Sequence, residues 1–149
     1  MVRILGKIAL IAVGYLAAVC VAVVVTESIM LAPAALPDGG TNGSLMGLLR
    51  DLPGMFAVGF FWTFLCALPG FIVAIIIGER LDWSRWRDYA TAGLLNVIPS
   101  LAFFWGFAGS PFSMPFLIIS ALPGGFAGGA AYWTLAGRFI ARNRRLPTA

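Results

Sequence analysis

Residues 8–25 read IALIAVGYLAAVCVAVVV, an apolar run without a charged residue. A helix that spans a bilayer needs about 20 mostly apolar residues, and this run exceeds that length when it is continued to residue 32. It is also longer than the hydrophobic core of about 7–15 residues in a cleaved signal peptide. We therefore expect residues 8–32 to form a membrane-spanning helix that the chain retains.

Three further segments are apolar and long enough to cross a bilayer, at residues 53–78, 89–107 and 113–137. In lipid the backbone groups must bond within such a segment, which favours helices. The 149 residues are 60% hydrophobic and 11% charged, whereas soluble domains average about 45–50% and about 25%. The sequence therefore predicts an all-α fold in which residues 1–149 form one transmembrane domain, an integral membrane four-helix bundle.

The positive charges are distributed asymmetrically between the two sides that this threading defines. Of the ten Lys and Arg residues, only Arg50 falls on one side. Because cytoplasmic loops are enriched in Lys and Arg, we expect the N-terminus, the C-terminus and the 79–88 loop to be cytoplasmic. The side with the positive charges holds Arg3, Lys7, Arg80, Arg85, Arg87, Arg138, Arg142, Arg144 and Arg145.

The last four of these arginines follow the fourth span. Each is expected to gain about 1 kcal/mol from anionic lipid headgroups. We expect no nucleic-acid partner, because no folded basic module accompanies this tail.

Two of the expected spans resemble each other. Residues 67–80 read ALPGFIVAIIIGER, and residues 121–138 read ALPGGFAGGAAYWTLAGR. This likeness favours two tandem helical hairpins; the alternative is a chance recurrence in a chain rich in these residue types. Pro69 and Pro123, like Pro99 in the third span, should bend their helices.

Small residues mark two faces that would let helices approach closely in lipid. Either face could join helices within one chain or form the seam of a homo-oligomer, and packing within the chain is the preferred interpretation. The face on the second span comprises Gly59, Thr63, Ala67, Gly70, Ala74 and Gly78, and the face on the fourth comprises the overlapping GxxxG patterns of Gly124, Gly125, Gly128 and Gly129.

Polar residues within apolar runs are candidates for a functional site. Glu27 falls near the outer end of the first span, where it would be an interfacial carboxylate or, alternatively, a proton- or cation-coupled site. Asn96 lies deeper in the third span and should need a partner on a neighbouring helix. Before the second span, Asp51 is the expected N-cap, with Pro53 in the first helical turn.

Aromatic residues gather near the expected cytoplasmic boundary. Trp83 and Trp86 lie in the loop before the third span, and Tyr132 and Trp133 lie near the end of the fourth. Trp and Tyr are enriched where membranes meet water. We therefore expect these four residues to act as interfacial anchors.

The sequence contains no histidine, and its two cysteines, Cys20 and Cys66, lie in separate apolar runs. Histidine-based acid–base catalysis and His/Cys metal sites are therefore not expected from this chain. No pattern suggests a cofactor, so a non-enzymatic role is the expectation.

The quoted patterns ALPGFIVAIIIGER and GFAGGAAYWTLAGR, together with Tyr89-Ala90 and Ala92-Gly93, resemble uncharacterised small four-span membrane proteins of alphaproteobacteria. The resemblance implies a bacterial inner membrane and the same topology, and it carries over no site residue. Two functions remain open: an accessory or structural membrane subunit is preferred, and the alternative is a small oligomeric transporter or channel. A polar cavity that reaches Glu27 or Asn96 would favour transport, whereas a dry core would favour the accessory role.

Overall fold

The computed structural model describes residues 2–32, 45–108 and 114–140, with side chains described for 5–32, 50–106 and 115–140. The described chain is all-helical. Its elements are α1 (Val2–Leu31), α2 (Leu45–Arg80), α3 (Trp86–Ala108) and α4 (Met114–Tyr132), and α4 continues into the π-helix η2 (Trp133–Gly137).

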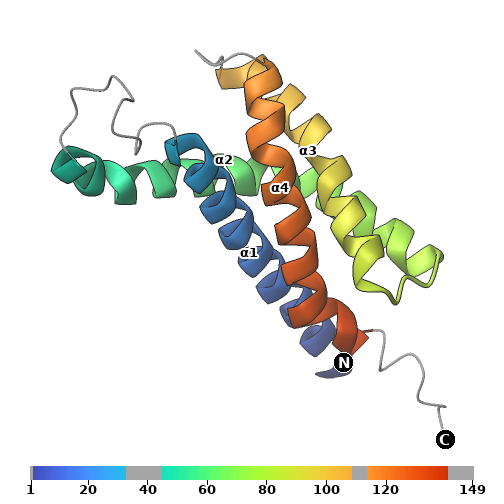
Figure 1. Ribbon diagram of the computed structural model, residues 1–149. Helices are drawn as coiled ribbons and strands as arrows, with labels where there is room; N and C mark the ends of the chain where they lie inside the picture. The colour runs from blue at the N-terminus through green and yellow to red at the C-terminus, as the bar shows by residue number, and fades with distance from the viewer. Residues whose placement is uncertain (1, 33–44, 109–113, 141–149) are drawn as a thin grey trace, which may run out of the picture.

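Helix α4 lies between α1 and α3 and runs antiparallel to both (Figure 1). Both outer helices make their most extensive contacts with α4, and α2 crosses this layer at a steep angle while it packs against α1 and α3. Helices α1 and α2 contact each other much less than α3 and α4 do. The two expected hairpins are therefore packed differently.

Three helices of the described chain are long and apolar enough to cross a membrane: Leu5–Leu31, Arg50–Arg80 and Pro115–Ile140. The third expected span, 89–107, is a helix but is not among these three. Asn96, Pro99 and Ser100 lie in its middle and lower its mean hydropathy.

Helix α2 begins at Leu45, earlier than the residue 53 that we expected. Asp51 therefore lies within the helix, and the expectation that it is the N-cap is wrong. Pro53 is likewise internal, and its side chain is exposed. The physical reason is the composition of residues 45–49, LMGLL, in which Leu and Met are good helix formers that extend the helix towards its N-terminus.

The junction between α2 and α3 is specified by local contacts. Asp82 has a φ of 50°, and the Trp83 N–H donates to the Gly78 carbonyl at 3.0 Å, as in a Schellman turn. The Trp83 ring packs over Gly78, where a Cβ atom would lie 3.1 Å from it. Helix α3 then starts with the Arg85 N–H donating to the Asp88 carboxylate at 3.2 Å, which is half of a capping box.

The four glycines of α4 face two different neighbours. Cβ atoms built at Gly124 and Gly128 would lie 2.7 and 2.8 Å from the carbonyl oxygens of Ala22 and Ala18 in α1. Gly125 and Gly129 approach α3 in the same way, at Gly93 and at the backbone of Tyr89 and Ala90. The overlapping GxxxG patterns thus seat α4 between two helices at once.

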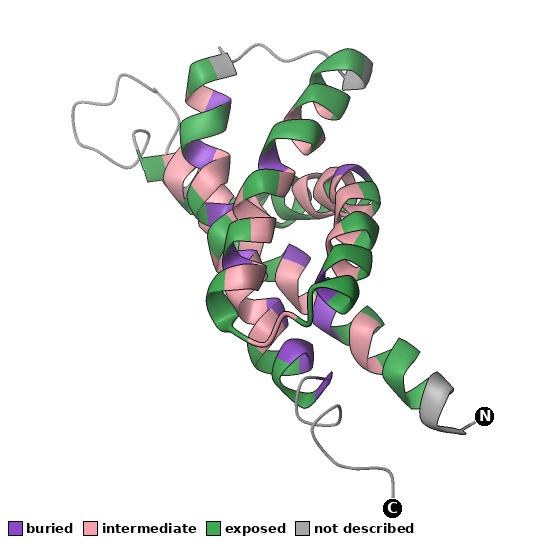
Figure 2. Ribbon diagram, turned by 90° about the vertical axis from the view of Figure 1, so that its right-hand side faces the viewer, coloured by how far each residue is buried: buried purple, intermediate pink, exposed green. Residues whose placement is uncertain are grey.

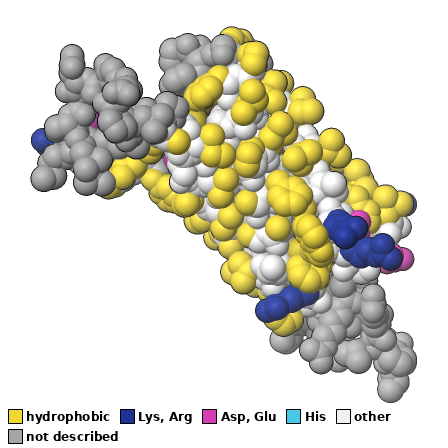
Figure 3. Space-filling model, viewed as in Figure 1, with side chains coloured by type: hydrophobic (Ala, Val, Ile, Leu, Met, Phe, Trp, Pro, Cys, Tyr) yellow, Lys and Arg dark blue, Asp and Glu magenta, His cyan; other side chains and the backbone are white. Residues whose placement is uncertain are grey.

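Most of the outer surface is apolar. Exposed residues follow the outer side of every helix (Figure 2), and they include Ile119, Leu95 and Val58, which are 67%, 63% and 60% exposed. On the face shown in Figure 3, hydrophobic side chains predominate, and the described Lys and Arg side chains lie towards its ends. A monomer in water rarely exposes so much contiguous apolar surface, so this exterior suits lipid or protein partners.

Candidate functional site: a cavity between the four helices

A partly open cavity of about 800 Å³ lies among the helices, and residues from α1, α2, α3 and α4 all line it. Along α1 it extends from Tyr15 to Leu31, a rise of about 24 Å at about 1.5 Å per residue. Its walls are predominantly apolar. Small-molecule sites typically have volumes of about 300–1,000 Å³ and apolar walls with a few polar groups, so this cavity is the candidate site.

Glu27 stands at one end of the cavity and is half-buried. Its carboxylate packs against Gly59 of α2, where a Cβ atom would lie 2.6 Å from Oε1. The missing side chain at residue 59 thus makes room for the carboxylate. Glu27 also borders a second cavity of about 330 Å³, which is lined further by Leu52, Pro53, Met55 and Phe56.

Asn96 and Ser100 of α3 join this helix to α2 near Pro69. Asn96 Nδ2 donates to the Ala67 carbonyl at 3.1 Å. The Ser100 hydroxyl is shared between the Asn96 carbonyl of its own helix at 2.7 Å and the Cys66 carbonyl of α2 at 3.3 Å. Pro69 removes the N–H that would bond the Leu65 carbonyl, whereas the regular helical donor to the Ala67 carbonyl is the Phe71 N–H, so the bond from Asn96 is additional to those of α2. Asn96 therefore has the partner on a neighbouring helix that its position requires.

The Oδ1 atom of Asn96 is buried and has no hydrogen-bond partner among the described residues. It occupies the space that a side chain at Gly70 would fill, since a Cβ atom built there would collide with it. The amide is therefore held in place by shape as well as by its bond to α2.

Aromatic side chains close the opposite end of the cavity. The ring of Phe71 lies 4.3 Å from that of Tyr15 and 5.2 Å from that of Tyr132, and Tyr132 lies 5.5 Å from Tyr89. The Tyr15 hydroxyl donates to the Phe64 carbonyl of α2 at 2.5 Å. This aromatic cluster connects α1, α2, α3 and α4.

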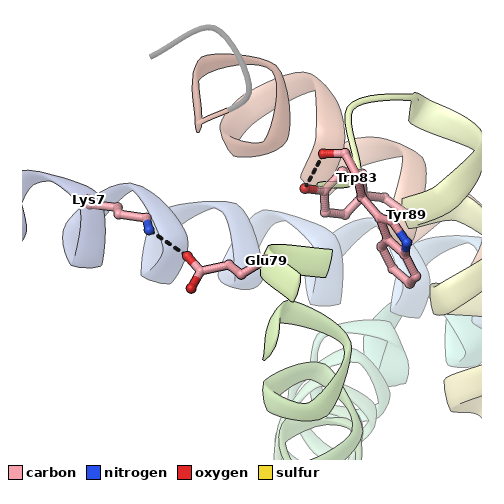
Figure 4. A network of polar contacts seen from close by, with 4 residues as sticks. All are labelled: Lys7, Glu79, Trp83 and Tyr89. Carbon is pink, nitrogen blue, oxygen red and sulfur yellow. Dashed lines mark hydrogen bonds and ion pairs between the residues drawn. The ribbon is translucent and has the colours of Figure 1, made fainter. Parts of the chain in front are cut away.

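Polar contacts outside the cavity connect the helix ends beyond this cluster (Figure 4). Lys7 Nζ lies 2.5 Å from Glu79 Oε1, which joins the start of α1 to the end of α2. The Tyr89 hydroxyl donates to the Trp83 carbonyl at 3.4 Å. These contacts lie at the ends of α1, α2 and α3 that we expect to face the cytoplasm.

The small-residue face expected on α2 does not form one tight helix contact. Gly59, Gly70 and Gly78 pack against the side chains of Glu27, Asn96 and Trp83 respectively. The remaining members of the face line the cavity; they are Thr63, Ala67 and Ala74. A face with helix-packing spacing therefore serves in part as a cavity wall.

The four expected interfacial aromatics have different environments. Trp86 is 43% exposed, whereas Trp83 and Trp133 are half-buried, and Trp133 Nε1 donates to the Ser84 carbonyl at 3.3 Å. Tyr132 is only 4% exposed, so its interpretation as an interfacial anchor is wrong. Because α4 is flanked on two sides, Tyr132 points into the aromatic cluster instead.

Some of the residues singled out from the sequence lie outside the part of the chain that the structure describes. Arg142, Arg144 and Arg145 lie outside the described residues, as does the Arg3 side chain. Sequence reasoning missed the roles of Tyr15 and Ser100. Two features of the sequence could have indicated these roles. Tyr15 carries a hydroxyl within the apolar run 8–25, and Ser100 follows Asn96 by four residues.

The described residues contain no group of three or more His, Cys, Asp or Glu that could hold a metal ion. Comparisons of the chain with protein-family models, curated proteins and solved structures find no match.

Proposed function

We propose that this chain is a non-enzymatic, multi-pass protein of a bacterial inner membrane that serves as an accessory or structural subunit. The observation that carries the proposal is the contrast between the two sides of its helices. The small residues of α4 are used for contacts within the chain, while large apolar side chains cover the outside. Such an exterior remains available for lipid and for another membrane protein or a second copy of the chain.

The orientation in this proposal has both termini in the cytoplasm, and it rests on the positive charges. The Lys7–Glu79 contact supports the threading but does not distinguish the two orientations, because it joins two helix ends that the threading puts on the same side. The assignment to a bacterial inner membrane rests on the resemblance of residues 67–80 and 125–138 to alphaproteobacterial proteins. The arginines after residue 140 would then contact anionic lipid.

The subunit role is tested by isolating the tagged chain at its natural expression level in mild detergent and measuring the mass of the particle. We expect a complex of defined stoichiometry with a membrane protein or with further copies. A single copy surrounded only by detergent and lipid would contradict the subunit role and leave the membrane location intact.

A small oligomeric transporter is the second candidate, and the cavity is the observation that favours it. The cavity reaches both Glu27 and Asn96, as transport would need, but its walls are predominantly apolar and not polar. Its apolar walls suit an apolar or amphiphilic substrate better than a hydrated ion. Uptake or release of such a substrate by liposomes that contain the chain would establish this function, and its absence would leave the subunit role preferred.

A further inference from the structure

The charge of the cavity has one sign. Glu27 is the single acidic or basic side chain among the described residues that line it. The structure shows no ion pair between Glu27 and a described residue. A carboxylate in a partly desolvated site attracts a cation more strongly than it would in water.

The surroundings of Glu27 suit a cationic headgroup in two further ways. Trp62 also lines the cavity, and it follows Gly59 by one helical turn on α2, so an aromatic ring borders the same end. Cations interact favourably with the faces of such rings. In addition, Glu27 also borders the smaller cavity, which leaves space for a headgroup beside the carboxylate.

The shape of the cavity suits a chain. The residues of α1 that line it span about 24 Å, and the apolar walls run from Glu27 to the aromatic cluster at Tyr15, Phe71 and Tyr132. A phospholipid would bring a second chain and a phosphate that Glu27 would repel.

We propose that the cavity binds a single-chain amphiphile with a protonated amine headgroup, the ammonium group against Glu27 and the alkyl chain extending towards Tyr15 and Tyr132. The proposal rests on the membrane location proposed above and holds for either candidate function. It assigns Glu27 to ligand binding.

The test uses the full chain in nanodiscs of zwitterionic lipid. Three probes carry bromine at carbons 6 and 7 of the same chain, closer to the headgroup end where Trp62 lies than a bromine on the terminal carbon would be, and they differ only in the headgroup: 6,7-dibromododecylamine, 6,7-dibromododecanoate and 6,7-dibromododecanol. Bromine quenches indole fluorescence on contact, so a probe in the cavity should quench Trp62. We expect saturable quenching by the amine, and only the weak, non-saturating quenching of lipid-facing tryptophans by the other two.

Substitutions locate the site. Glu27→Gln should weaken amine binding by at least about tenfold, because the ion pair is lost, whereas Asp51→Asn makes the same change on an exposed residue outside the cavity and should have no effect. Trp62→Phe should remove the saturable component of quenching. Ala74→Leu should narrow the cavity and weaken binding, while Val73→Leu, at a residue that is 54% exposed, should not.

Three outcomes would overturn the proposal: equal saturable binding of the carboxylate or the alcohol, unchanged binding by Glu27→Gln, or no saturable binding of the amine by the folded wild-type chain. None of these outcomes bears on the membrane location or the subunit role, because those are measured by membrane extraction and by the mass of the isolated particle.

Discussion

Gly93 of α3 and Gly125 of α4 face each other so closely that neither position has room for a side chain. A Cβ atom at Gly125 would lie 2.7 Å from the Gly93 carbonyl oxygen, and one at Gly93 would collide with the Gly125 carbonyl. In lipid, where apolar side chains gain little by leaving the solvent, such backbone proximity is a principal source of helix association.

Gly125→Ala should therefore destabilise the chain by about 1–3 kcal/mol through overpacking. Gly106→Ala in α3 is the matched control, since a Cβ atom there meets no atom within 4 Å. Thermal unfolding of both variants in the same detergent measures the difference. Equal melting temperatures for Gly125→Ala and the wild type would show that this contact does not contribute to the fold.

The bonds from α3 to the α2 carbonyls lead to a second prediction. Asn96→Ala should cost about 0.6 kcal/mol, the average measured for interhelical hydrogen bonds in a membrane protein, and at most about 1.7 kcal/mol. The cost should be nearly the same in a Pro69→Ala background, because the helical donor to the Ala67 carbonyl is the Phe71 N–H, which Pro69 does not remove. A double-mutant cycle in unfolding free energy measures this, and a coupling well above about 0.5 kcal/mol would show that Pro69 positions the Ala67 carbonyl for Asn96.

A third prediction concerns the ends of α1 and α2. Cysteines substituted for Lys7 and Glu79, in a chain with Cys20 and Cys66 replaced by alanine, should be joined within one chain by a short bis-maleimide, because the tips of the two long native side chains are in contact and a linker can span the distance that a direct disulfide could not. Lys7→Cys combined with Asp51→Cys is the control, since Asp51 lies near the other end of α2. Faster migration of the first pair alone on a denaturing gel would verify the contact, and cross-linking of neither pair would count against it.

The proposed orientation is tested in the same cysteine-free background. An impermeant thiol reagent applied to intact cells should label Asp51→Cys, and it should label Arg85→Cys only after lysis, because the positive-inside rule assigns the 79–88 loop to the cytoplasm. Both positions are exposed in the structure, so failure of labelling would reflect the membrane barrier. The opposite pattern would reverse the topology.

Neutralising Glu79 tests how much its ion pair contributes. Both partners are nearly half exposed, and exposed pairs contribute only about 0.2–1 kcal/mol. Glu79→Gln should therefore leave the melting temperature almost unchanged. A loss of several kcal/mol would show that the pair is part of a larger network at the helix ends.

The sequence by itself determined the helices, because hydropathy is a local property of each segment. Runs such as 8–25 fold as helices whatever their neighbours are, and the spacing of Gly124, Gly125, Gly128 and Gly129 predicted a close contact on α4. The same spacing could not say that two of these glycines face α1 and two face α3. That assignment depends on which helices lie on either side of α4.

The cavity and the environment of Tyr132 were likewise decided by the tertiary structure alone. Tyr132 has the residue type and position of an interfacial anchor, but α4 has neighbours on two sides and its tyrosine is buried. Thr63, Ala67 and Ala74 have the spacing of a packing face, but the steep crossing of α2 leaves them along the cavity. Periodicity reports which residues share a helix face, whereas the neighbour of that face is set by how well distant segments fit one another in shape.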